Sequence, residues 1–152
     1  MSFLKSIISF LLRYKTFKHP LFGLLVDQYQ EGVYYGTHRF QFQSEPVEIY
    51  FPQECIAQAS HHKACAEELE QRYEALLPDI LNAIVGAYNK HIHGAMATAE
   101  QFRGRVVIES VFPPKNYADN DWQLAYNCEL FDDYYILVFL DKWEVVEASV
   151  ID

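Results

Sequence analysis

The stretch that decides the fold is residues 122–150, WQLAYNCELFDDYYILVFLDKWEVVEASV. In residues 122–130 large apolar side chains occupy every second position, which is the period of a half-buried strand. Asp132-Asp133 then supplies a turn, the apolar run Tyr134–Leu140 follows, and a last short run closes the stretch. This pattern predicts a three-stranded meander with acidic turns.

The region before this stretch predicts further strands and a long helix. Residues 22–30 and 33–43, separated by Glu31-Gly32, read as a hairpin, and a third strand follows that Pro52 ends. A continuous apolar stripe at helical spacing then runs from Cys65 to Ile92, between a predicted N-cap at Ser60 and a stop at Gly94. Pro78 either kinks this helix or begins a second one. Residues 105–112 predict one more strand.

The first 18 residues have a pattern of their own. Phe3, Leu4, Ile7, Ile8, Leu11 and Leu12 recur at i, i+3 and i+4 spacing. That spacing predicts an amphipathic helix, too short to span a bilayer and without a signal-peptide cleavage site. We expect it to pack against protein, although its basic residues also allow contact with a membrane surface.

Together these patterns predict an α+β fold. It comprises an antiparallel sheet of three strands, a long or kinked helix and three to four further strands, with an N-terminal amphipathic helix. At 152 residues and 51% hydrophobic composition, the chain is long enough for one core. We therefore expect two parts: the amphipathic helix over residues 1–18, and a single α+β domain over 19–152.

Charge is unevenly distributed along the chain. Lys5, Arg13, Lys15 and Lys18 give the first 18 residues a formal charge of +4. The other 8 basic and 21 acidic residues leave positions 19–152 at −13. An acidic body repels phosphates, so we expect no nucleic-acid partner, and it favours cationic partners. An acidic surface that serves only solubility is the simpler alternative.

Residue types that are common in metal sites and catalytic sites are present, but they lack the spacing that such sites need. His61 and Cys65 lie one helical turn apart, but a zinc site needs three or four ligands, and His91 and His93 are too distant to complete it. We expect no metal, no cofactor and no enzymatic activity, because P-loop, GxGxxG and GxSxG motifs are all missing. The three cysteines have no paired spacing, which predicts free thiols in a reducing, cytoplasmic environment.

Three segments of the sequence resemble those of a known protein family. The helix sequence ILNAIVGAYN (80–89), the segment YNCELFDDYYILV (126–138) and the closing VVEAS (145–149) resemble small α+β domains of bacterial polymorphic-toxin loci, some of them considered immunity proteins. The shared pattern is an aromatic residue followed by two acids, a hydrophobic strand and a closing strand with Val-Val-Glu. The resemblance covers about half of the chain and implies a protein that neutralises a cognate toxin.

The leading functional hypothesis is therefore an immunity protein that occludes a toxin with a basic surface. The partner-binding residues expected from the sequence are acids and one aromatic near the last strands: Tyr117, Asp119, Asp121, Glu129, Asp132 and Asp133. Two alternatives remain open. One is a membrane-peripheral adaptor that uses residues 1–18. The other is a small enzyme whose site is built from His38, Glu109 or the paired tyrosines.

Overall fold

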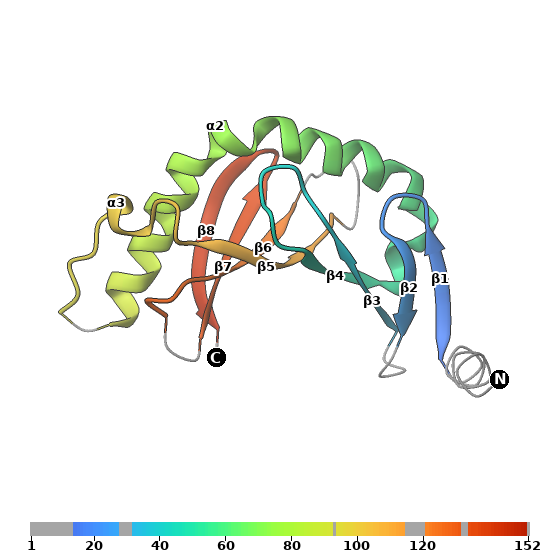
Figure 1. Cartoon of the computed structure of the whole chain (residues 1–152), viewed down its shortest axis with the longest axis horizontal. Helices are drawn as coiled ribbons and strands as arrows, with labels where there is room; N and C mark the ends of the chain where they lie inside the picture. Colours follow the sequence, from blue (N-terminus) through green and yellow to red (C-terminus); the bar gives the residue numbers. More distant parts are fainter. Residues whose placement is uncertain (1–13, 28–31, 93, 115–120, 132–133, 152) are drawn as a thin grey trace.

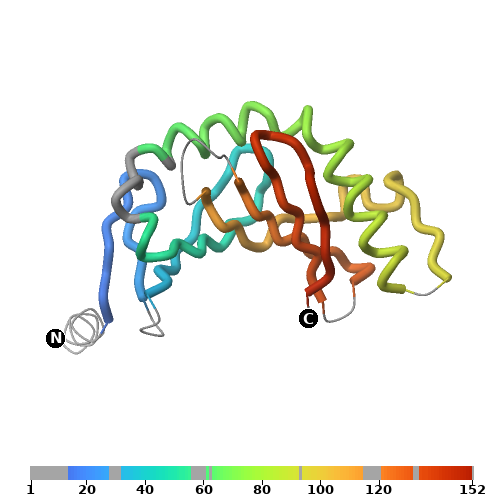
Figure 2. The backbone as a smooth tube through the Cα atoms, turned by 180° about the vertical axis from the view of Figure 1, so that it is seen from behind, coloured from blue at the N-terminus to red at the C-terminus, as the bar shows by residue number. Residues whose placement is uncertain are grey.

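One eight-stranded sheet dominates the computed structural model. The structure describes residues 14–27, 32–92, 94–114, 121–131 and 134–151, and within these ranges it describes only the backbone of residues 56–60 and 62. The strands lie side by side in the order of the sequence, so β1 and β8 form the two edges of the sheet (Figures 1 and 2). The strands are β1 (Lys15–His19), β2 (Gly23–Asp27), β3 (Val33–His38), β4 (Val47–Pro52), β5 (Val107–Phe112), β6 (Gln123–Asn127), β7 (Tyr135–Asp141) and β8 (Glu144–Ile151).

The sheet is mixed because one pair of strands in its middle is parallel. Strands β4 and β5 run in the same direction, with Glu48 opposite Ser110 and Ile49 opposite Val111. The other neighbouring pairs are antiparallel. Parallel neighbours need a long crossover connection. Here it is made by the 3₁₀ helix η1 (Gln53–Gln58), the long helix α2 (Ala59–His91) and the short helix α3 (Ala99–Phe102).

Helix α2 is a single helix of 33 residues that continues through Pro78. Its length is about 50 Å, and it arches across one side of the sheet (Figure 1). Pro78 is exposed, so the backbone hydrogen bond that proline cannot make is lost on the solvent side of the helix. Of the two predicted alternatives, the structure thus shows one helix rather than two.

The core lies between α2 and the face of the sheet that it covers. The buried helix residues recur at intervals of three and four, from Cys65 through Leu69, Tyr73, Leu76, Ile80 and Ile84 to Ala87. They belong to one cluster with the inward residues of the strands, such as Val47, Ile49, Phe51, Val111, Leu124, Ile136 and Val138. In β4 and β7 the buried residues alternate with more exposed ones. Helix α2 therefore closes one face of the sheet only.

The predicted fold class is wrong in two respects, although the C-terminal meander is present as β6–β8. First, the sheet is one mixed sheet of eight strands with little helix beside it, because the crossover through α2 makes β4 and β5 parallel. Second, residues 15–18 of the predicted N-terminal helix belong to β1 and pair with β2. Phe17 and His19 turn toward the core while Lys15, Thr16 and Lys18 are exposed, which is strand alternation. Residues 1–13, with the predicted apolar stripe, lie outside the described residues.

Two glycines test the packing of the core. A side chain on Gly36 in β3 would collide with the side chain of Leu25, which is fully buried, whereas a side chain on Gly86 in α2 would meet nothing within 4 Å. We expect Gly36→Ala to lower the free energy of unfolding by about 1–3 kcal/mol. Gly86→Ala, the matched control, should raise it by about 0.5–1 kcal/mol because alanine favours the helix. Urea unfolding of both variants measures the difference. Equal effects would show that β2 and β3 do not pack as closely as described.

Candidate functional site

The side of the sheet that α2 leaves uncovered carries a row of aromatic side chains. Cross-strand register places Tyr35 of β3 opposite Tyr50 of β4, and the parallel pairing brings Phe112 of β5 next to Tyr50. The rings of Tyr35 and Tyr50 meet edge to face with centroids 4.9 Å apart, and those of Tyr50 and Phe112 stack at 5.0 Å. All three side chains are half-buried. Because each ring is held by its neighbour, the row forms a firm apolar platform.

The platform continues across the C-terminal strands. Gln123 lies opposite Phe112 and Phe139, while Leu137 lies opposite Ala125. We call this side of the sheet the open face. Its main half-buried or exposed residues are Tyr35, Glu48, Tyr50, Glu109, Phe112, Gln123, Asn127, Tyr135, Leu137 and Phe139.

The open face is acidic as well as aromatic. Strands β3–β8 contain no lysine or arginine, and their acidic residues are Glu48, Glu109, Asp141, Glu144 and Glu147. The strand that does carry lysines is β1, at the far edge of the sheet. The ion pairs seen among the described residues do not involve Glu48 or Glu109. The negative charge of the platform is therefore not neutralised by neighbouring cations in the described part of the chain.

Glu109 is held in place by neutral hydrogen-bond donors. It lies at a bulge in the pairing of β5 with β6, between Ile108 and Ser110. One carboxylate oxygen accepts a hydrogen bond from the side-chain amide of Asn127 at 2.9 Å, and the other accepts one from the hydroxyl of Tyr135 at 3.4 Å. The negative charge of Glu109 raises the pKa of Tyr135, with burial, this hydrogen bond and the charge of Glu48 acting in the same direction. The Tyr135 hydroxyl thus stays protonated as a donor at neutral pH.

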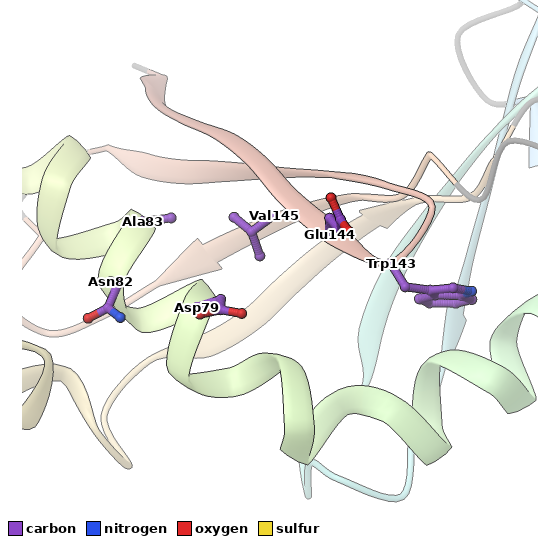
Figure 3. Close-up of a pocket in the computed structure, with 6 residues that line it drawn as sticks. All are labelled: Asp79, Asn82, Ala83, Trp143, Glu144 and Val145. Carbon is purple, nitrogen blue, oxygen red and sulfur yellow. The ribbon is translucent and has the colours of Figure 1, made fainter.

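A groove lies between α2 and the β7–β8 hairpin. This groove has a volume of about 480 Å³, with Asp79 and Asn82 on the helix and Glu144 and Val145 on the strand (Figure 3). The hairpin turn places Lys142 and Trp143 at positive φ, of 48° and 68°, which costs non-glycine residues on the order of 1 kcal/mol each. The guanidinium of Arg72 lies 5.5 Å from the centre of the Trp143 ring, and this contact fastens the turn to α2. A structural role therefore accounts for Trp143.

Of the partner-binding residues predicted from the sequence, the structure describes Asp121 and Glu129, and it places them apart. Asp121 is half-buried and precedes β6, whereas Glu129 is exposed beyond the other end of β6. A carboxylate oxygen of Glu129 lies 3.3 Å from the guanidinium of Arg105. Tyr117, Asp119, Asp132 and Asp133 lie outside the described residues. The aromatic platform was missed, although the alternation of Glu48 and Tyr50 with Val47, Ile49 and Phe51 already assigns those two residues to one face.

The residues considered for an enzymatic site are divided between the two sides of the sheet: Glu109 and Tyr135 contact each other on the open face, whereas His38 does not lie there. His38 lies on the helix side of the sheet, where its ring centroid is 4.7 Å from that of Phe40 and 5.3 Å from that of Phe22. Glu109 lies on the open face. Burial lowers the pKa of His38, and the charge of Glu70 partly offsets this effect. His38 and Glu109 are therefore on opposite sides of the sheet and cannot act on one substrate atom.

Other features of the described residues bear on metals, thiols and membranes. They include no cluster of three or more histidine, cysteine, aspartate or glutamate residues able to hold a metal ion. All three cysteines are buried thiols outside any disulfide, and burial is the main cause that raises the pKa of Cys65 to about 11. None of the described helices has the length and apolar character of a transmembrane helix.

The lowered pKa of His38 predicts a loss of stability in mild acid. As the pH is lowered through the ordinary pKa of about 6.5, the unfolded chain takes up a proton at this position before the folded chain does. The free energy of unfolding therefore decreases as the pH is lowered, until the pKa of the folded state is passed. We expect His38→Gln to lose less stability than the unmodified chain between about pH 7.5 and about pH 5.5. Urea unfolding at both pH values measures this, and identical losses would contradict it.

The contact between Glu109 and Tyr135 makes a second prediction. Glu109→Gln removes the negative charge that opposes formation of the phenolate, so the pKa of Tyr135 should fall back toward its ordinary value of 10. NMR titration of the Tyr135 ring carbon that bears the hydroxyl follows this change. Glu74→Gln removes an acid from the exposed side of α2 and serves as the control. An unchanged pKa in Glu109→Gln would mean that the two side chains do not interact.

No family profile, curated protein or solved structure matches the chain. The resemblance to immunity-type domains therefore stays a prediction.

Proposed function

We propose that the chain is a binding protein whose open face docks on a cationic partner protein and occludes it. The partner we favour is a cognate bacterial toxin, which makes the chain an immunity protein. The observation that carries this proposal is the combination of a firm aromatic platform with carboxylates and no lysine or arginine across six consecutive strands.

The chemistry of the open face supports a protein partner. Tyrosine and other aromatic residues provide much of the binding energy at protein interfaces because they bury large areas with few rotatable bonds. Five strands from β3 to β7 span about 19 Å at the usual spacing between strands. A standard interface buries about 800 Å² per partner, so the open face would supply its centre and the flanking segments its rim.

The charge of the open face supports the choice of a basic partner. Complementary charges accelerate encounter and disfavour wrong partners, and an acidic face repels the phosphates of nucleic acids. A toxin that acts on nucleic acid needs a cationic site, and such a site is what this face would cover. We also propose a cytoplasmic location, where buried thiols such as Cys55 and Cys128 stay reduced.

The test uses the protein encoded by the neighbouring open reading frame as the candidate partner. We expect the two products to co-purify and their association rate to fall as salt rises, because exposed charges are screened over about 10 Å at 0.1 M salt. Leu137→Lys places a positive charge in the open face and should weaken the complex by about ten- to a hundredfold.

The matched control is Leu77→Lys, which changes a leucine that is also half-buried but lies on α2, and which leaves the open face intact. It should alter the affinity by less than about twofold, since a lysine at the protein surface can extend its ammonium group into water. Thermal unfolding of both variants verifies that they fold. Equal weakening by both variants, or a salt-independent association rate, would contradict docking through the open face.

A further inference from the structure

The open face has a hollow at its centre, where small side chains lie between large ones. In the cross-strand register Glu48 of β4, Ser110 of β5 and Ala125 of β6 are direct neighbours. The aromatic pair Tyr50 and Phe112 rises on one side of the small residues Ser110 and Ala125, and Tyr135 and Ile151 rise on the other. The result is a cavity of about 280 Å³ in the platform.

Two carboxylates line this cavity, and the described residues that line it include no lysine or arginine. Glu109 receives hydrogen bonds from Asn127 and Tyr135, and Glu48 receives one from the hydroxyl of Tyr50 at 2.7 Å. These donors are neutral and fix the carboxylates in position. Both carboxylates also act on Tyr135, whose phenolate they disfavour. The cavity therefore combines two oriented negative charges with a stacked aromatic wall.

We propose that this cavity is a socket for one arginine side chain presented by the partner protein. The inference rests on the proposed function, because it names the group through which the partner of the open face is anchored. A planar guanidinium stacks on aromatic rings and donates paired hydrogen bonds to a carboxylate. The wall of Tyr50 and Phe112 offers the first contact, and Glu48 and Glu109 offer the second. Lysine carries a compact, strongly hydrated charge that stacks poorly, so arginine fits the socket better.

The socket is tested on the full chain with a small probe. Titration with N-acetyl-arginine amide should shift the NMR signals of Glu109, Ser110, Ala125 and Tyr135, with weak, millimolar affinity. The citrulline analogue has nearly the same shape without the charge and should bind at least about tenfold more weakly. N-acetyl-lysine amide should bind more weakly than the arginine probe. Equal binding of the citrulline and arginine probes would overturn a cation socket, and equal binding of lysine would overturn the choice of arginine.

Three variants locate the probe. Glu109→Gln keeps the size and the hydrogen-bonding ability of the side chain and should reduce binding of the arginine probe at least about fivefold. Ser110→Val fills the hollow without altering charge and should also reduce binding of the arginine probe at least about fivefold. Glu74→Gln, which removes an acid from the exposed side of α2, should leave binding unchanged. Equal losses in Glu109→Gln and Glu74→Gln would show that only net charge matters and would overturn the socket.

The same variants separate failure of the socket from failure of the proposed function. If the neighbouring gene product binds, and Leu137→Lys weakens the complex while Glu109→Gln and Ser110→Val do not, the open face is the docking surface but the socket is wrong. If the arginine probe binds as expected while the neighbouring gene product does not, the socket holds and the choice of partner is wrong. A loss of partner binding of about tenfold or more in Glu109→Gln and in Ser110→Val supports the socket as well as the proposed function.

Discussion

The packing of α2 against a single face of the sheet is the constraint on which the rest of the structure depends. Ile80, Leu81 and Ile84 are fully buried, and a large aliphatic side chain contributes about 1.5–3 kcal/mol when it leaves water. One helix can cover only one side of a sheet, so the other side, on which the described residues place no second layer, must be stable in water. The open face meets this requirement with half-buried rings that cover one another, rather than with a fully polar surface.

The crossover through α2 also determines what the open face contains. Because β4 and β5 are parallel neighbours, residues from the two halves of the chain meet in the middle of the sheet. Tyr50 comes before α2 in the sequence and Phe112 after it, yet their rings stack. The hollow beside them has the same origin, since Glu48 comes from the first half and Ser110 and Ala125 come from the second. The site is thus a product of topology and not of a local motif.

This origin explains how much could be predicted from the sequence. Strands β6–β8 and helix α2 are visible because a period of two or of about 3.6 is a local property. Strand β1 was missed because Phe17 and His19 alternate over only five residues, directly after a run with helical spacing. The period of a strand does not encode the direction of its partner, so the parallel pair was not predictable. The platform needed that pairing before Tyr50 and Phe112 could be recognised as one surface.

The charge pattern favours a binding surface over one that is acidic only for solubility. Acids that serve solubility can lie anywhere, and α2 carries several that pair with lysine or arginine on its outer side, such as Glu68 with Arg72. Glu48 and Glu109 instead accept hydrogen bonds from Tyr50, Asn127 and Tyr135 on a half-apolar platform. The like charges of Glu48 and Glu109 repel each other across one cavity, and no ion pair of the described residues involves either of them. A partner that brings a positive charge relieves this repulsion, so the arrangement favours the complex over the free chain.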